Sequence, residues 1–242
     1  VLSGGRVDGG QIVWSDRDSD VRIEAYGQAS VGGQTVEAHG AVIETGGYVQ
    51  ASQNITLVGG SDVTDTGVRV YAGSELSTRK LSSSILIQSA SDADVQGIVL
   101  AGGQVTDVVD ASGAYLGRAI ESFSGDSKLS IDAGHQIRVG SELRAGKRIE
   151  LHGGADPLEA SPTDGSPNRS GKSVVLYGSA RVITAAENST VAVSGPAGIH
   201  LLAHDHAQEI AAAGWIATAG GRLGQDVTLS VQVDRVDFQY AG

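Results

Sequence analysis

The first residues of this chain whose types and spacing could do chemistry are three aspartates at alternate positions, Asp16, Asp18 and Asp20. On a strand their carboxylates point to one face, and in a loop they could surround Ca²⁺, which prefers oxygen ligands. The segment lacks the glycine and the distal glutamate of a helical calcium loop. We therefore expect no cofactor, and a structural Ca²⁺ ion at these three aspartates is the alternative.

A second cluster contains His204, Asp205 and His206. Two histidines that are two residues apart on a strand share a face, as two ligands of a zinc ion would. They supply only half of a tetrahedral zinc site, and the remaining histidines are too scattered to complete it. Those are His39, His135, His152 and His200. The sequence therefore predicts no metal site here.

A third group could cleave a polysaccharide, because hydrolases use carboxylates about 5 to 10 Å apart and lyases use an Arg or Lys base. The candidates are Asp92, Asp94, Asp107, Asp110 and Arg118. No motif marks them as a site, and 2 Trp, 6 Tyr and 2 Phe leave few rings to line a sugar-binding cleft. We expect these carboxylates to keep the surface soluble and discourage edge pairing, so we expect no enzyme. A polysaccharide lyase or hydrolase is the alternative.

The elements that would position these side chains follow a short period. Between Leu129 and Gly154 the apolar strand starts Leu129, Ile137, Leu143 and Ile149 are separated by 8, 6 and 6 residues, together 20. Each piece alternates apolar and polar residues and then breaks at a glycine or a small polar residue. A single coil of this kind cannot bury its apolar face, so coils must stack. The pattern predicts a β-solenoid with coils of about 20 residues.

A second stretch has a similar spacing of apolar residues, since Val36, Val42, Val49 and Ile55 are separated by 6, 7 and 6 residues. Residues 207–214 could form a short helix, but we interpret them as extended. Further short apolar units lie at 68–70, 85–87, 98–100, 174–176, 191–193 and 227–229. We expect inward-facing ladders from Val36, Val42, Ile55, Ile87, Leu100, Ile131, Val139, Ile149, Leu151, Leu176 and Val193.

Composition supports one extended domain over 1–242, with 35 Gly for corners and neither Cys nor Met. The formal net charge of −11 argues against a nucleic-acid partner, because phosphate binding needs a basic face. No window approaches the roughly 18 apolar residues of a membrane span. The chain begins without Met or a signal peptide, so we expect a mature product or a piece of a longer chain. The lack of cysteine fits bacterial surface proteins.

One segment, 156–173, leaves the pattern and holds three of the four prolines. It lies between strands that we expect to end at Leu151 and to begin at Val174. We therefore predict a loop that protrudes from the stack. Its alternatives are a tolerated insertion and a contact loop for an extracellular partner.

Residues 131–154, which carry Ala-Gly corners, resemble the repeat region of filamentous-haemagglutinin-like large exoproteins, the two-partner-secreted adhesins. The resemblance covers Val31 to Gly154 and is weaker in the C-terminal third. The Asn-Pro-Asn-Gly-type motifs of that family's secretion domain do not occur in this sequence. The resemblance implies an internal shaft segment and carries over no catalytic residue.

Together these patterns predict an all-β chain that forms a right-handed parallel β-helix, the handedness following from the preference for right-handed crossovers. The expected function is a structural shaft or adhesive fibre segment of a large secreted or cell-surface protein, bacterial in origin. The alternatives are a carbohydrate-active β-helix enzyme and an extracellular partner-binding module that uses the 156–173 loop. The expected partners are neighbouring coils, of the same chain or another copy, that abut end to end at 227–240, and a host-surface or glycan receptor.

Overall fold

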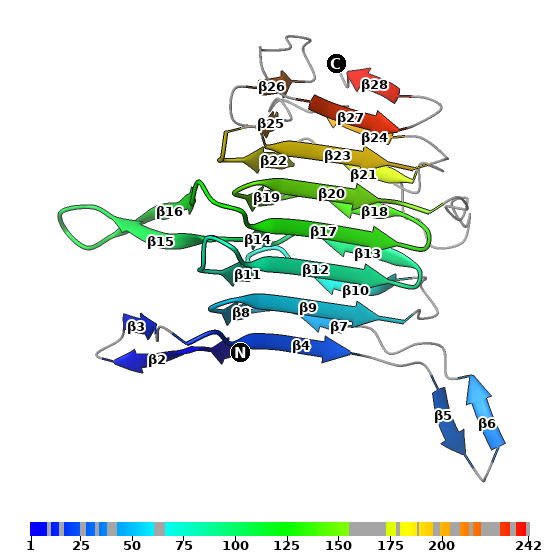
Figure 1. The fold of residues 1–242 in the computed structure, drawn as a ribbon, viewed down its shortest axis with the longest axis horizontal. Helices are drawn as coiled ribbons and strands as arrows, with labels where there is room; N and C mark the ends of the chain where they lie inside the picture. Colours follow the sequence, from blue (N-terminus) through cyan, green and yellow to red (C-terminus); the bar gives the residue numbers. More distant parts are fainter. Residues whose placement is uncertain are drawn as a thin grey trace.

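The computed structural model contains large parallel sheets. Within each sheet the strands lie one above the next, from the N-terminal coil at the bottom of the view to the C-terminal coil at the top (Figure 1). It contains 28 strands and no helix among the residues that it describes. In that part of the chain, therefore, no helix could span a membrane. The structure describes residues 1–8, 11–14, 17–24, 28–31, 34–37, 43–60, 66–154, 173–177, 180–187, 189–195, 199–203, 209–212, 215–218, 228–232 and 236–240.

Three large sheets form the body. Sheet 1 contains, in order, β1 (Leu2–Ser3), β8 (Tyr48–Ala51), β11 (Glu75–Thr78), β14 (Ile98–Leu100), β19 (Glu142–Ala145), β22 (Arg181–Thr184), β25 (Glu209–Ala212) and β26 (Trp215–Thr218). Sheet 2 contains β28 (Val236–Tyr240), β24 (Ile199–Ala203), β21 (Val174–Leu176), β18 (Ile137–Val139), β13 (Asp92–Val95), β10 (Thr66–Val70) and β7 (Ile43–Thr45). Sheet 3 contains β27 (Thr228–Gln232), β23 (Thr190–Ser194), β20 (Arg148–His152), β17 (Lys128–Ala133), β12 (Ser84–Ser89), β9 (Asn54–Gly59) and β4 (Asp20–Glu24).

Neighbouring strands in these sheets are parallel, except that β26 runs antiparallel to β25. Apart from β25–β26 and the antiparallel hairpins, successive strands of the chain belong to different sheets. The chain thus passes through the three sheets in turn and then pairs with its own previous coil. The fold is thus all-β with parallel sheets, which is compatible with the expected β-solenoid. Residues 209–212, part of the segment with weak helix potential, are extended as predicted.

The coil that the sequence marks most clearly is present. Its four strand starts fall in β17, β18, β19 and β20, and Leu129 pairs with Ile149 in parallel register. The chain therefore returns to sheet 3 after 20 residues at this place. Elsewhere the interval is longer: Ile85 pairs with Leu129, which is 44 residues further along. A uniform coil of about 20 residues does not describe the chain.

Eight of the predicted ladder residues belong to one buried core cluster. They are Ile55, Ile87, Ile131, Val139, Ile149, Leu151, Leu176 and Val193. Val42 lies outside the described residues. Leu100 is buried as expected, but it is paired with Ser77 and Arg144, while its neighbour Val99 is paired with the core residues Leu76 and Leu143. Because side chains alternate along a strand, Leu100 faces outward, and the prediction that it points into the core is wrong.

Three antiparallel hairpins leave this stack: β2 (Gly5–Asp8) with β3 (Gln11–Trp14), β5 (Gln28–Val31) with β6 (Gln34–Glu37), and β15 (Gly103–Val109) with β16 (Tyr115–Ser122). Figure 1 shows β15–β16 and β5–β6 projecting on opposite sides. Val36 lies in β6, so the prediction that it belongs to a stacked coil is wrong. An alternating pattern is the same in both kinds of strand, and the Gly-Gly pair at 32–33 was the hairpin signal. The predicted 156–173 loop lies outside the described residues, except Ser173.

Candidate functional site

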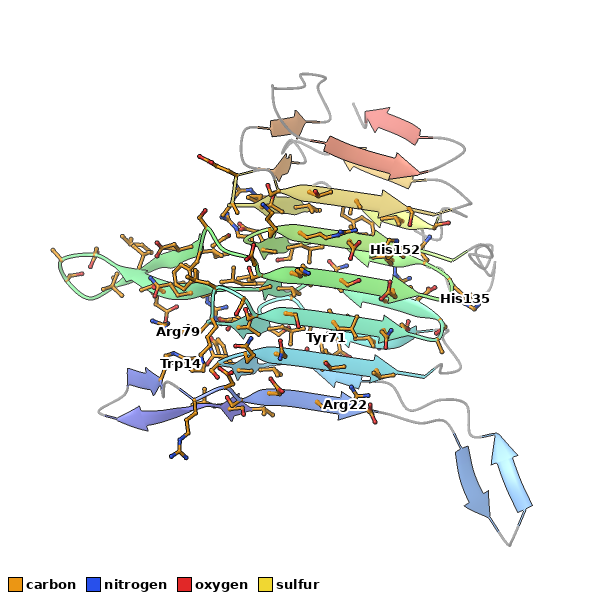
Figure 2. The ribbon with its side chains drawn as sticks, in the orientation of Figure 1. Trp14, Arg22, Tyr71, Arg79, His135 and His152 are labelled. Atoms are coloured by element: carbon orange, nitrogen blue, oxygen red, sulfur yellow. The ribbon has the colours of Figure 1, made fainter. Side chains whose placement is uncertain are left out.

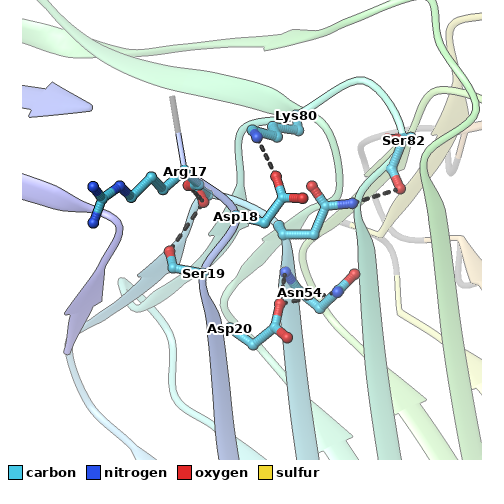
Figure 3. A network of polar contacts seen from close by, with 9 residues as sticks. Arg17, Asp18, Ser19, Asp20, Asn54, Lys80 and Ser82 are labelled. Atoms are coloured by element: carbon cyan, nitrogen blue, oxygen red, sulfur yellow. Dashed lines mark hydrogen bonds and ion pairs between the residues drawn. The ribbon is translucent and has the colours of Figure 1, made fainter. Parts of the chain in front are cut away.

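Two of the three aspartates proposed for calcium, Asp18 and Asp20, form contacts between coils. Asp18 forms an ion pair with Lys80, and Asp20 Oδ1 accepts hydrogen bonds from Asn54 N at 3.1 Å and Asn54 Nδ2 at 2.9 Å (Figure 3). Asn54 Oδ1 in turn accepts from Ser84 Oγ at 2.8 Å. Asp16 lies outside the described residues, and no group of three or more metal-binding side chains occurs among those that are described.

The histidines do not assemble into a described site. His204, Asp205, His206 and His39 lie outside the described residues. His135 and His152 are labelled in Figure 2, on the side of the stack away from the β15–β16 hairpin. His152 Nδ1 is 2.6 Å from Ser194 Oγ on the next strand of sheet 3, so this ring has an inter-coil partner. His200 lies in β24, paired with Val175.

Asp92 and Asp94 lie on β13 of sheet 2, beside Arg138 on β18. Arg138 Nη2 is 3.6 Å from Asp92 Oδ2 and 3.8 Å from Asp94 Oδ2. The backbone N–H of Gln136 donates to Asp92 Oδ1 at 3.0 Å. Nearby, burial raises the pKa of Tyr177 above its ordinary value of 10.0, while Arg138 opposes the shift. Both carboxylates are thus engaged in holding neighbouring coils together.

Asp107, Asp110 and Arg118 instead lie in the β15–β16 hairpin. Asp107 on β15 is paired with Arg118 on β16, and Arg118 Nε is 3.6 Å from Asp107 Oδ1. Asp110 Oδ1 accepts from Ser112 N at 2.8 Å, Ser112 Oγ at 2.6 Å and Ala114 N at 2.9 Å. The Ser112 side chain contributes most to lowering the pKa of Asp110. The five candidate catalytic residues are therefore divided between two separate places.

The geometry reveals a different candidate, here called the hairpin groove. It is a cavity of about 660 Å³ between the outer face of sheet 1 and strand β15. This volume falls in the range of about 300 to 1,000 Å³ that is usual for ligand pockets. The residues on which its chemistry depends are Trp14, Gln50, Glu75, Ser77, Arg79 and Asp107.

The floor of the hairpin groove comes from β8 and β11. Leu76 lies in the core, so Glu75 and Ser77 on either side of it face outward. Both are nevertheless buried, with Glu75 only 2% exposed. Strand β15 contacts β11 and covers this part of the outer face, which also explains why outward-facing Leu100 is buried.

Two features hold the hairpin over this floor. Arg118 on β16 donates a hydrogen bond to the Tyr48 hydroxyl on β8, and its guanidinium carbon lies 5.1 Å from the Tyr48 ring centroid. At the base of β15, a Cβ on Gly103 would lie 2.7 Å from Leu100 Cδ1, which is closer than real Cβ contacts. Glycine thus lets β15 approach the sheet closely enough to bury Leu100. The hairpin is therefore fixed at both its base and its middle.

The remaining wall comes from Trp14, at the end of β3, and Arg79, which follows β11. The Arg79 guanidinium carbon lies 5.8 Å from the Trp14 ring centroid, within cation–π range. Figure 2 shows both residues at the edge of the stack, between the β2–β3 and β15–β16 hairpins. One aromatic ring, one cation and two carboxylates, Glu75 and Asp107, therefore border one cavity.

Inside the hairpin groove, Glu75 is held by two donors. Glu75 Oε1 accepts from Gln50 Nε2 at 2.9 Å and from Ser77 Oγ at 2.6 Å. Among the described residues Glu75 Oε2 has no partner, and it is not one of the fully buried atoms without a partner. One carboxylate oxygen is therefore fixed, while the other is accessible from the groove.

A second groove, of about 690 Å³, contains a small basic cluster of Lys128, Lys147 and Arg148. Its donors are largely engaged, because Arg148 forms an ion pair with Glu150 and Lys147 Nζ donates to the Glu187 carbonyl at 2.9 Å. The hairpin groove, with an accessible buried carboxylate and an aromatic wall, is the stronger candidate site.

Sequence reasoning selected Asp107 but missed Trp14, Glu75 and Arg79. These residues meet only because two hairpins and two coils converge, and no local spacing records that. The one available signal was the 105–109 run, rich in β-branched residues, followed by the Gly-containing 110–114 segment, a combination that is typical of a hairpin. Comparison of the chain with family models, with curated proteins and with solved structures finds no match to any of them.

Proposed function

We propose that this chain is a structural shaft or adhesive fibre segment of a large secreted or cell-surface protein of bacterial origin, built as a right-handed parallel β-helix. The observation that carries the proposal is the unbroken parallel pairing of sheet 3 from β4 to β27, in which each inner strand pairs with a coil on either side. Stacking of this kind makes a quasi-one-dimensional body whose stability comes from neighbouring coils.

The buried ladder supports this function energetically. Ile85, Leu129 and Ile149 occupy consecutive paired positions and are at most 1% exposed. Burial of each such side chain contributes about 1.5 to 3 kcal/mol, and the stack repeats this contribution coil after coil. On the outside, Arg181 Nη1 is 3.0 Å from Glu142 Oε1 of the preceding coil. Apolar and ionic ladders together resist separation of the coils.

The last strand of sheet 3 supports end-to-end partners. Among the described strands, β27 pairs with β23 alone, and no described strand pairs with its other edge. An exposed edge is a template for pairing with another chain or another coil. A neighbouring coil, from the same parent chain or from a second copy, is the proposed occupant.

Light scattering of the purified chain over a range of concentrations tests the end contact. Ser230→Lys in β27 puts a charge on the edge strand, and Ala192→Lys, at the paired position in the inner strand β23, is the matched control. We expect concentration-dependent association of the native chain, weakened by Ser230→Lys and retained in Ala192→Lys. A monomer at every concentration, with slow amide exchange in β27 and β28, would contradict the end-to-end contact.

A carbohydrate-active enzyme is the second candidate function. The observation that favours it is the pair of carboxylates, Glu75 and Asp107, in the hairpin groove. Release of products from acidic or neutral polysaccharides, lost in both Glu75→Gln and Asp107→Asn, would establish it in place of a purely structural function. The third candidate, partner binding through the 156–173 loop, depends on residues outside the described part of the chain.

A further inference from the structure

We propose that the hairpin groove binds a neutral saccharide. This proposal goes beyond the structural function and does not depend on it. It rests on one accessible carboxylate oxygen in a buried setting, on a mixture of hydrogen-bond donors and acceptors around that oxygen, and on an aromatic ring at the groove wall.

Glu75 is the central group. Its side chain lies beneath β15, its Oε1 is fixed by Gln50 and Ser77, and its Oε2 has no partner among the described residues. This oxygen belongs to a nearly buried side chain, has no donor in the described part of the chain and is reached from the groove, so a ligand hydroxyl could donate a hydrogen bond to it. A hydrogen bond to a charged acceptor contributes more than one between neutral groups.

The rest of the groove offers both kinds of partner. Arg79 has only donors, Asp107 has only acceptors when ionised, and Thr106 and Gln104 supply both. Each hydroxyl of a sugar can donate one hydrogen bond and accept others, so adjacent hydroxyls match such a mixed surface. The ring of Trp14 adds a flat apolar wall, which complements the C–H face of a pyranose.

Charge favours a neutral ligand. Glu75 and Asp107 both border the groove, and the chain as a whole has a formal net charge of −11. An acidic sugar would therefore be repelled both locally and at long range. A divalent cation is not favoured either, because the described residues contain no group of three or more metal-binding side chains.

Fluorescence of Trp14 provides a direct test. The chain has 2 Trp, so the Trp215→Phe variant of the full chain leaves Trp14 as the single tryptophan reporter. The probes are cellotetraose, maltotetraose, mannotetraose and chitotetraose, each titrated to about 10 mM, which is about tenfold above a Kd of 1 mM. We expect a saturable change in Trp14 emission with at least one of them.

Variants in the Trp215→Phe background assign the signal to the groove. Glu75→Gln keeps the shape of the side chain, and we expect about tenfold weaker binding, the usual loss when a charged hydrogen-bond partner is replaced. Thr106→Val, at an exposed position of β15 that lines the groove, gives a second variant if Glu75→Gln does not fold. Asp126→Asn, in the basic second groove, is the matched control and should bind as the parent does.

The outcomes separate the ligand classes. Saturable binding that is weakened by Glu75→Gln or Thr106→Val, and is unchanged in Asp126→Asn, supports the proposal. It is overturned if no saccharide gives a saturable signal, or if both groove variants bind as tightly as the parent. It is also overturned if trilysine, a probe for cationic protein segments, gives a saturable Glu75-dependent signal and the saccharides do not.

Discussion

Two successive coils of the same stack differ in how much chain they contain. The coil from Leu129 to Ile149 closes in 20 residues, whereas the one from Ile85 to Leu129 needs 44 and includes the β15–β16 hairpin. The paired core residues at their ends are equally buried. The core therefore constrains the register of the strands but leaves the length of the corner free, as expected when loop closure depends only weakly on loop length.

The extra chain in the longer coil changes the surface. The tip of the hairpin is exposed, with Leu116 65% accessible, but its base covers Glu75 and Leu100. The β15–β16 hairpin adds little to the main core, but it buries Glu75 and Leu100, which face outward from sheet 1. Among the residues that the structure describes, the short coil adds to the core alone, while the long coil supplies strand β15, which closes the hairpin groove together with Trp14 of β3.

The largest expected effect is in the short coil. Ile149→Asp places a charge in the interior, where Ile149 is fully buried and paired with Leu129 and Val191. We expect a loss of at least about 4 kcal/mol in the free energy of unfolding, measured by urea denaturation. Glu150→Gln, at the outward-facing neighbouring position, is the control and should change it by less than about 1 kcal/mol. An unchanged transition midpoint in Ile149→Asp would refute the inward register of β20.

The difference between the short and the long coil also explains which features of the fold the sequence predicts. The coil at 129–149 was predicted with its strand starts because one face must be buried and the alternation repeats without interruption. Leu100 was assigned to the core since it is apolar and lies in an apolar run, yet an insertion three residues later buries it from outside. Val36 was misassigned for a related reason, because hairpin strands and stacked strands share the same period of two.

The groove could not be derived from local patterns. Trp14, Glu75 and Asp107 are far apart in sequence, and they border one cavity only after the coils and hairpins are placed. Glu75 also looks like an ordinary surface glutamate in a strand that alternates normally. Its burial depends on how the base of β15 lies over β11, and Gly103 makes that approach sterically feasible.

The second expected effect compares two carboxylates that the sequence treated alike. Asp92 is nearly buried beside Arg138 and accepts the Gln136 N–H, whereas the Asp107 side chain is 67% exposed. Asp92→Ala should reduce the free energy of unfolding by about 3 kcal/mol, because it removes the closer of the two carboxylates beside the nearly buried Arg138 and leaves the Gln136 N–H without its acceptor. Asp107→Ala should reduce it by less than about 1 kcal/mol. If urea denaturation gave equal losses for the two variants, it would contradict the inference that Asp92 stabilises the stacked coils much more than Asp107 stabilises the hairpin.

The smallest expected effect is at the hairpin tip and depends on pH. Hydrogen bonds from Ser112 and Ala114 lower the pKa of Asp110 below its ordinary value of 3.8. A lowered pKa means that the ionised form is favoured in the folded turn, so its contribution is present above pH 3.8 and is lost as the pH falls through the folded pKa. NMR titration of the Ser112 and Ala114 amide shifts should therefore give a midpoint below 3.8, and Asp110→Asn should abolish it. Since the turn is exposed, the melting temperature of the whole chain should stay unchanged in that variant. A midpoint at or above 3.8 would mean that Asp110 does not hold the turn, and the rigidity of the hairpin would then depend on Arg118 and the covered base alone.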